Sequence, residues 1–370
     1  MNIGIDARLW QETGVGRYIR ALVENLAVVD KQNNYTLFLK SQSWNVVKLP
    51  NSRWQKIKAD VSWHTLNEQI LMPIIYKRAR LDLLHIPYFA VPVFTSVPFV
   101  VTIHDLTISH FATGKATTKP LPLYAMKQMG YRLVLAAAVK RAVRVITVSR
   151  TVKSELLGKY RLAEDKVIAI YEAGTLEAQA EVAELTTPEK FILYVGNAHP
   201  HKNLDRLVEA YKLLQRSHPQ LKLVLIGRED YFYRQLKKYS QELGVSGVIF
   251  PGEADNGELA FWYKRALAFI FPSLSEGFGI PGLEAMSLGC PVVASNIAVF
   301  KEIYGDAAVY TNPYDPEDLA KTINNLIENT IIRSNLVTLG QQRAKNFSWK
   351  QMAERTMSVY ENCLGLRPRK

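Results

Sequence analysis

One stretch of 25 residues, Phe271–Ser295, restricts the fold of this chain more than any other feature. It reads FPSLSEGFGIPGLEAMSLGCPVVAS, which predicts a strand end, a glycine loop, a short helix and a second buried strand. The loop glycines allow positive φ and a close approach of the backbone to a ligand. Pro281 suits the first turn of the helix and Gly289 suits its end. Open α/β sheets bind ligands at such loops, beyond the carboxyl ends of their strands.

Two carboxylates belong to this stretch. Glu276 falls in the glycine loop, and Glu284 falls one turn into the helix. We therefore expect Glu276 to point into the crevice and Glu284 to lie close behind the helix start, not side by side on one helical face. Unpaired N–H groups at a helix N-terminus suit a phosphate, and a carboxylate can hold the vicinal hydroxyls of a ribose or a sugar ring. For either glutamate alone, a buried loop or a capping role is the alternative.

The string SEGFGIPGLEAMSLGCPVVAS resembles the motif of the retaining glycosyltransferases in the large family of sucrose synthase and many bacterial mannosyltransferases. That family carries two glutamates separated by seven residues, matched by Glu276 and Glu284. The resemblance implies an α/β GT-B fold, in which two Rossmann-like doubly wound domains face each other across a cleft. It implies that Glu276 contacts the donor sugar in catalysis and that Glu284 contacts the nucleotide ribose. The other donor-binding positions in the motif are Gly277, Phe278, Gly279 and Ile280.

The length of the chain favours two domains, and its cysteine content favours the cytoplasm. A chain of 370 residues exceeds one core, and 48% apolar with 22% charged residues is ordinary for a globular protein. Two cysteines are too few for a disulfide framework, and the chain enters a strand at once without a signal peptide. The predicted parts are an acceptor-side domain at 1–173, a linker at 174–189, a nucleotide-sugar domain at 190–347 and a helix at 348–370 that crosses back to the first domain.

The first domain is predicted to alternate strands and helices. Buried strands are expected at Asn2–Ile5, Tyr35–Leu39, Trp54–Ala59, Leu81–Ile86, Phe99–Ile103 and Val143–Val148. A helix around Leu66–Arg80 is expected to be interrupted at Pro73. His104 follows the fifth strand and matches a family histidine that contacts the donor sugar, although a lone histidine is often structural.

A glycine turn, Gly14-Val15-Gly16-Arg17, follows the first predicted strand. It resembles a dinucleotide-binding fingerprint, but the third glycine of that pattern is replaced by Ile19. In the family this loop faces the donor phosphates, so Gly14, Gly16 and Arg17 are candidate donor-binding residues. A plain tight turn between strand and helix is the alternative.

The second domain is predicted to be a second doubly wound sheet. Its strands are expected at Phe191–Val195, Leu221–Ile226, Val248–Phe250, Ala268–Phe271 and Pro291–Ala294. In the loop after its first strand, the family places an arginine and a lysine against the donor diphosphate. Lys202 matches the catalytic lysine, whereas the arginine is missing. Asn197 and His201 stand in this loop as donor-binding candidates. Residues predicted to flank the base are Gly227, Arg228, Gly252 and Glu253.

Positive charge is concentrated in one segment. Of the net charge of +12, an excess of +9 lies between Lys115 and Lys166, with twelve basic and three acidic residues. This indicates an anionic partner. Pro122–Arg141 is predicted to be an amphipathic helix that rests on the anionic inner face of the cytoplasmic membrane, its apolar positions being Tyr124, Met129, Leu133, Leu135 and Val139. A solvated basic face is the alternative. Aromatic and basic residues are not interleaved as in proteins that bind nucleic acids, so the sequence does not predict such binding.

These patterns favour a retaining hexosyltransferase that uses a nucleotide-diphosphate sugar and passes the sugar to a glycan or lipid-linked acceptor. The segments TGVGRY and PHKN resemble bacterial mannosyltransferases of surface polysaccharides such as lipopolysaccharide, so GDP-mannose is the first candidate donor. A UDP-sugar donor is the alternative. A nucleotide-sugar epimerase on the same fold and a basic, non-enzymatic binding protein are rival functions that the same residues allow. No cofactor and no metal are expected, because no acidic cluster accompanies the loop motifs.

Overall fold

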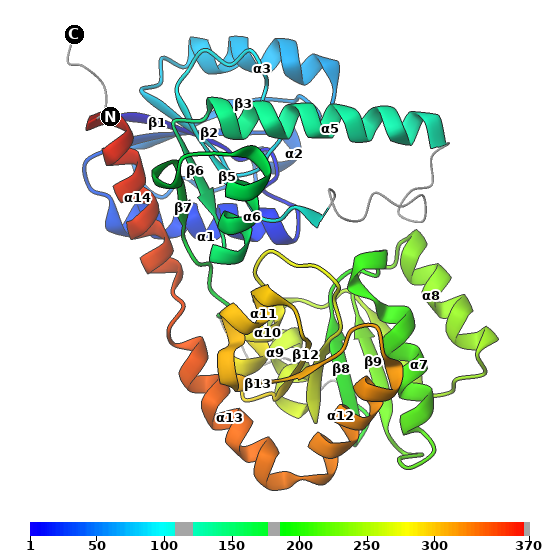
Figure 1. Ribbon diagram of the computed structural model, residues 1–370. Helices are drawn as coiled ribbons and strands as arrows, with labels where there is room; N and C mark the ends of the chain where they lie inside the picture. The colour runs from blue at the N-terminus through cyan, green and yellow to red at the C-terminus, as the bar shows by residue number, and fades with distance from the viewer. Residues whose placement is uncertain (108–120, 177–185, 366–370) are drawn as a thin grey trace. The chain divides into compact units, whose positions relative to one another are not determined.

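The computed structural model describes residues 1–107, 121–176 and 186–365 (Figure 1). The chain forms two compact units. Unit 1 comprises Met1–Glu172 and the chain from Trp349 onward, and unit 2 comprises Ala173–Ser348. The predicted linker at 174–189 lies largely outside the described residues. Each unit is a parallel α/β sheet, which is the predicted fold class.

Unit 1 is built on a seven-stranded parallel sheet in the order β3-β2-β1-β4-β5-β6-β7. Its strands are β1 (Asn2–Asp6), β2 (Asn34–Leu39), β3 (Trp54–Lys58), β4 (Leu83–Ile86), β5 (Phe99–Ile103), β6 (Arg144–Thr147) and β7 (Val167–Ala169). Its helices are α1 (Gly14–Val29), α2 (Ser41–Trp44), α3 (Leu66–Arg78), α5 (Leu121–Arg141), α6 (Arg150–Tyr160) and α14 (Trp349–Gly365), with a 3-10 turn at Glu164–Lys166.

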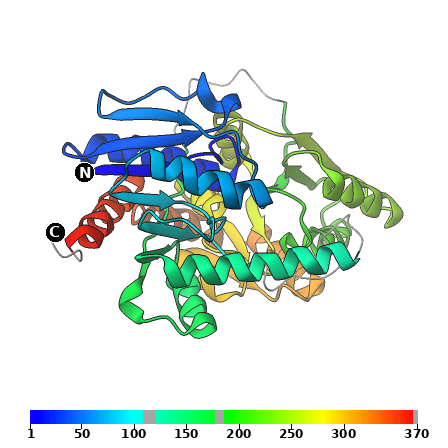
Figure 2. The same ribbon diagram turned by 90° about the horizontal axis from the view of Figure 1, so that it is seen from above.

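Helices cover both faces of the unit 1 sheet (Figures 1 and 2). On one face, α1 and α14 pack against each other and against residues of β1 and β2. On the other face, α3, α5 and α6 supply buried side chains to a second apolar core. The central strands β4 and β5 are buried along their whole length and are mostly apolar, as expected for a parallel sheet.

Unit 2 is built on a six-stranded parallel sheet in the order β10-β9-β8-β11-β12-β13. Its strands are β8 (Phe191–Val195), β9 (Lys222–Ile226), β10 (Val248–Gly252), β11 (Ala268–Phe271), β12 (Val292–Ser295) and β13 (Ala308–Thr311). Its helices are α7 (Leu204–Leu214), α8 (Tyr231–Glu242), α9 (Asn256–Arg265), α10 (Ile280–Ser287), α11 (Ala298–Tyr304), α12 (Pro316–Glu328) and α13 (Thr330–Ala344), with 3-10 turns at Pro200–Lys202 and Gly305–Ala307.

The order of the strands determines which loops are neighbours at the carboxyl edge of each sheet. In unit 2, β8 lies between β9 and β11, so the order in which successive strands are added reverses at β8, and the loops after β8 and β11 are neighbours at the carboxyl edge. In unit 1, β1 lies between β2 and β4 in the same way. Such switch points are where open α/β sheets bind ligands.

The structure corrects two expectations about unit 1. Helix α3 continues through Pro73, because Met72 and Tyr76, both fully buried, anchor the helix on either side of the proline. The apolar positions proposed for α5 also do not share one face of the helix. Leu135 and Val139 are buried, but Met129 and Leu133 are exposed to solvent. Within the basic segment, residues 115–120 lie outside the described residues.

Candidate active site

Two loops at the carboxyl edge of the unit 2 sheet are joined by hydrogen bonds. The first follows β8 and ends at Asn203, which adopts the left-handed conformation with φ 62°. The Asn203 side chain donates hydrogen bonds to the carbonyls of Pro272 (3.0 Å) and Pro313 (2.7 Å). The amide of Leu274, in the loop after β11, donates to the carbonyl of His201 at 2.8 Å. These bonds fix the loop after β8 against the loop after β11.

The joined loops bring Lys202 and Glu276 into contact. Lys202 Nζ lies 2.6 Å from Glu276 Oε1, and the two side chains are 15% and 13% exposed. The ammonium group also lies 5.7 Å from the centre of the Phe271 ring. A cation suits a phosphate and a carboxylate suits a sugar hydroxyl, so each member of this pair has the chemistry to bind one half of a nucleotide sugar.

The glycine loop enters α10 under tight steric limits. Gly279 has φ 104°, and the hydroxyl of Tyr304 donates a 2.7 Å hydrogen bond to its carbonyl. A Cβ atom at Gly279 would lie 2.2 Å from that hydroxyl oxygen, and one at Gly282 would lie 2.3 Å from it. Both positions therefore require glycine. The ring of Phe278 is buried against Phe347, so this side chain belongs to the core of unit 2.

Glu284 lies inside unit 2 and is 2% exposed. Its Oε2 accepts a 3.3 Å hydrogen bond from the hydroxyl of Tyr263 on α9. Glu276 and Glu284 are thus not side by side, and their partners differ. Sequence reasoning missed Tyr263, because nothing within the motif indicates a tyrosine 21 residues upstream. The contact of Glu284 with a ribose remains a prediction.

Three neighbouring strand ends of unit 2 are packed through glycines. The amide of Gly196 donates to Ile226 and that of Gly227 donates to Gly252, each at 2.9 Å. A Cβ atom at Gly227 would lie 2.0 Å from the carbonyl oxygen of Gly196. Tight packing is therefore sufficient to explain why residue 227 is a glycine, and no bound ligand is needed to explain it. Residues with side chains at this edge include Asn197, whose carbonyl accepts from Tyr194 at 2.7 Å, and the exposed Arg228 and Glu253.

In unit 1, the glycine turn and His104 both follow central strands. A Cβ atom at Gly16 would lie 2.6 Å from the carbonyl oxygen of Leu9, whereas Gly14 faces open space. Arg17, three residues into α1, is partly buried. His104 follows β5 directly; its ring meets the ring of Tyr18 edge-on at 4.8 Å between centroids.

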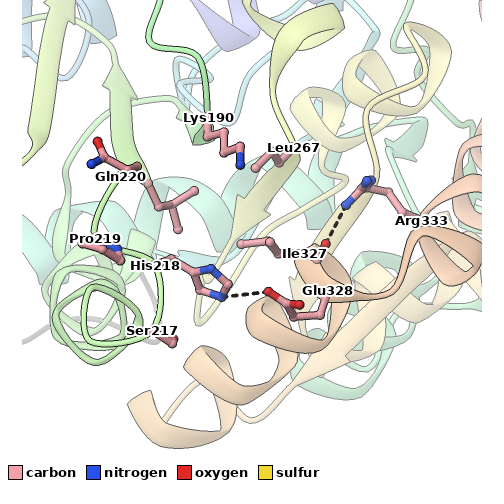
Figure 3. Close-up of a pocket in the computed structure, with 10 residues that line it drawn as sticks. Lys190, Ser217, His218, Pro219, Gln220, Leu267, Ile327, Glu328 and Arg333 are labelled. Atoms are coloured by element: carbon pink, nitrogen blue, oxygen red, sulfur yellow. Dashed lines mark hydrogen bonds and ion pairs between the residues drawn. The ribbon is translucent and has the colours of Figure 1, made fainter.

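A separate hollow of about 380 Å³ lies in unit 2 (Figure 3). Lys190, Leu221 and Leu267 line it, and each immediately precedes a strand of the sheet. Because all the strands are parallel, this hollow lies at the amino edge of the sheet, opposite Lys202 and Glu276. On one side of the hollow, His218 Nε2 lies 3.6 Å from Glu328 Oε1. The hollow is therefore distinct from the candidate site.

Within residues 1–107, 121–176 and 186–365, no group of three or more His, Cys, Asp or Glu side chains is arranged to hold a metal ion. Across the same ranges, no helix combines the length and apolar character needed to cross a bilayer.

The chain matches two family models. Residues 13–173 match Glycosyltransferase Family 4, and residues 177–343 match Glycosyl transferases group 1. The chain is 27% identical over 295 residues to the O-antigen chain mannosyltransferase RfbU of Salmonella typhimurium, covering 78% of each chain. It is 26% identical over 378 residues to the O-antigen chain mannosyltransferase B of Escherichia coli, covering 94% of this chain and 96% of that one.

Among solved structures, the sucrose-phosphate synthase of Thermosynechococcus elongatus is similar with a TM-score of 0.79 at 20% identity. The likeness covers 99% of this chain and 100% of that chain. It extends over both units and confirms the predicted fold.

Proposed function

Because this chain belongs to the group 1 glycosyltransferases with the GT-B fold, we propose that it is a retaining hexosyltransferase that uses a nucleotide-diphosphate sugar. The observation that carries the proposal is the pair Lys202–Glu276, held at 2.6 Å, with Glu276 in the loop that leads into α10. The donor replaces this internal pair: its diphosphate binds Lys202, and its sugar hydroxyls bind Glu276. Glu284 then binds the ribose hydroxyls of the nucleotide.

The proposed chemistry is a same-face displacement. The bond between the anomeric carbon and the diphosphate oxygen breaks, and a bond from the acceptor hydroxyl oxygen to the same carbon forms. The hydroxyl proton passes to the departing phosphate oxygen. Lys202 and the N–H groups at the start of α10 stabilise the negative charge that develops on the leaving group. Glu276 orients the sugar ring.

We propose GDP-mannose as donor and a glycan or lipid-linked glycan as acceptor, as in lipopolysaccharide synthesis. Support comes from the two mannosyltransferase relatives named for the O-antigen chain. The test is thermal stabilisation of the purified protein by GDP, UDP and ADP, followed by transfer of labelled mannose or glucose from the matching sugar nucleotide to an extracted lipid-linked fraction. Mannose transfer from GDP-mannose supports the proposal. Binding of UDP alone would shift it to a UDP-sugar, and epimerised donor without transfer would replace it.

We also propose that unit 1 docks on the anionic inner face of the cytoplasmic membrane. On the face of its sheet that carries α3 and α5, apolar and basic side chains are exposed together. The exposed apolar residues are Leu66, Ile70, Leu71 and Ile74 on α3 and Met129 and Leu133 on α5. Arg132 and Lys140 on α5 are exposed too. Apolar side chains enter the headgroup region, while each basic residue near such a surface contributes about 1 kcal/mol.

Liposome sedimentation at low salt tests this docking. The variant carries Arg132→Gln and Lys140→Gln, and its control carries Lys301→Gln and Lys321→Gln, which remove the same charge from exposed positions of unit 2. Arg141 is left unchanged because its guanidinium donates to the carbonyl of Thr95 at 2.9 Å. The α5 variant should lose binding to anionic liposomes while the control retains it. Equal binding by both, or none by the wild type, would leave a soluble acceptor as the better proposal.

A further inference from the structure

His104 has both ring nitrogens engaged within unit 1. Its Nδ1 lies 3.2 Å from Glu172 Oε1, and its Nε2 lies 3.1 Å from the carbonyl oxygen of Pro87. The side chains of His104 and Glu172 are only 13% and 5% exposed. Pro87 follows β4 and Glu172 follows β7, so three strand ends meet around one imidazole ring.

The partners constrain the protonation of the ring. A carbonyl oxygen can only accept a hydrogen bond, so Nε2 carries a proton. An ionised carboxylate can likewise only accept, so Nδ1 carries a proton as well. A ring with two N–H groups is an imidazolium cation, and with an ionised Glu172 it would form a buried ion pair across the 3.2 Å contact. Breaking such a pair by removing one partner is strongly destabilising.

The other titratable groups around the ring are consistent with one positive charge here. Burial opposes that charge, but the hydrogen bond and the charge of Glu172, with the Pro87 carbonyl and Asp105, raise the pKa of His104 above its ordinary value. His85 on β4 lies nearby, and burial together with the charge of His104 lowers its pKa to about 3, so it stays neutral. Tyr18 on α1 stays neutral too, because burial raises its pKa.

His85 itself is fixed by neutral hydrogen bonds. Its Nδ1 contacts the hydroxyl of Tyr360 on α14 at 2.6 Å, and its Nε2 contacts the hydroxyl of Thr102 at 2.8 Å. Thr102 in turn contacts the hydroxyl of Tyr18 at 3.2 Å. This neutral network packs against one side of His104. It carries no negative charge, so a positive charge on His104 can be balanced only by the carboxylates of Glu172 and Asp105 among the groups named here.

We propose that Glu172 is a positioning residue that holds His104 as an imidazolium cation in one orientation for sugar transfer. The role in transfer rests on the proposed function. Glu172 keeps Nδ1 and thereby fixes the ring, while a substrate oxygen takes the place of the Pro87 carbonyl at Nε2. His104 then presents a charged N–H donor, which forms a stronger hydrogen bond to a hydroxyl or phosphate oxygen than a neutral ring would.

The protonation state can be measured without any substrate. The chain has seven histidines, so long-range ¹H–¹⁵N spectra of the ¹⁵N-histidine-labelled full-length protein are tractable, and His104→Gln assigns the signal. At pH 7.5 the two His104 nitrogens of the wild type should have nearly equal shifts, as in imidazolium. Widely separated shifts, as in a neutral ring, would overturn the proposal, and this wild-type titration decides whether or not any variant folds.

Variants at Glu172 test the cause. In Glu172→Gln, the amide can donate to Nδ1, so the neutral ring is satisfied and His104 should bind its proton at least about tenfold more weakly. Glu172→Asp should restore part of the affinity. The control is Glu164→Gln, which removes the same charge from an exposed residue of unit 1 that faces Lys153 at 3.7 Å. An unchanged His104 titration in Glu172→Gln would assign the charge to another partner and refute the proposal.

Kinetics test the role in transfer. With the donor identified by the nucleotide screen, kcat of Glu172→Gln should fall at least about tenfold at pH 8 and recover toward pH 6, with KM changed little. A pH profile that overlays the wild type would refute the positioning role. If the wild type transfers no sugar at all, the proposed function fails and the role in transfer fails with it, whereas the spectra still decide whether His104 is charged.

Discussion

Replacing Glu276 by Gln should strengthen the binding of a free nucleoside diphosphate while it slows sugar transfer. In the unliganded protein, Lys202 Nζ is 2.6 Å from Glu276 Oε1, so a diphosphate competes with the carboxylate for the same cation. A glutamine at this position keeps the size and one acceptor oxygen but removes the negative charge. The competition therefore weakens, and Lys202 becomes available to the phosphate.

The magnitude follows from the burial of the pair. Exposed ion pairs contribute about 0.2–1 kcal/mol, whereas breaking a buried pair costs about 3–5 kcal/mol. With side chains 15% and 13% exposed, we place the cost of separating Lys202 from Glu276 between these limits, at about 2 kcal/mol. Relief of this cost corresponds to a Kd for GDP or UDP that is about 30-fold lower. For the sugar nucleotide, loss of the hydrogen bonds between Glu276 and the sugar hydroxyls, about 1.5–3 kcal/mol, cancels the gain.

Isothermal titration calorimetry with GDP, UDP and the matching sugar nucleotides measures both effects. The matched control is Glu242→Gln, which removes a carboxylate 3.6 Å from Lys238 on the exposed surface of α8. In Glu276→Gln, the affinity for the free diphosphate should rise relative to wild type, while the affinity for the sugar nucleotide should not. The control should change neither affinity. If it binds GDP and UDP no better than wild type does, the pair does not oppose the diphosphate and the reasoning is wrong.

Three further changes follow from the same site. Lys202→Ala should lower transfer about 10²–10³-fold, because the family arginine is absent from this loop; retention of more than a tenth of the activity would show that another cation carries the phosphate. Glu284→Ala should weaken sugar-nucleotide binding at least about tenfold and more than Glu276→Ala does, and Tyr263→Phe, which removes the hydrogen bond to Glu284, should weaken it less; equal small losses would remove the ribose assignment. EDTA should leave transfer intact, since the described parts of the chain hold no metal-ligand cluster; a loss that added Mg²⁺ or Mn²⁺ reverses would contradict this.

Strands and helices that are ended by residues such as proline or glycine were predictable from the sequence. The bounds of β5, β8 and β11 agree to the residue, because each is an apolar run that ends at a histidine, glycine or proline. Helix α13 was missed. Only Asn329 separates it from α12, and its buried side is limited to Leu336, Gly340 and Ala344, so neither a loop nor an apolar stripe indicates it.

The site was predictable only where a motif is local. The glycine loop and the start of α10 lie where the motif implied. The contact between Lys202 and Glu276 spans 74 residues and depends on β8 and β11 being neighbours, which no local pattern encodes. Glu172 is 68 residues from His104, and a single glutamate after a strand has no distinguishing context. Long-range pairing by strand order therefore limited what the sequence could indicate.

The missing arginine makes the positive charge of His104 testable in one further way. The loop after β8 offers a diphosphate one lysine, and that lysine is already neutralised by Glu276. A leaving group that gains negative charge is stabilised by every fixed cation that acts on it. If Lys202 and the His104 cation act on the same group, their effects on transfer are not independent, so Lys202→Ala and Glu172→Gln should show a coupling of at least about 0.5 kcal/mol in a double-mutant cycle at pH 8. Strictly additive losses would mean that the two cations contribute independently to transfer, and a shared action on the leaving group would then be refuted.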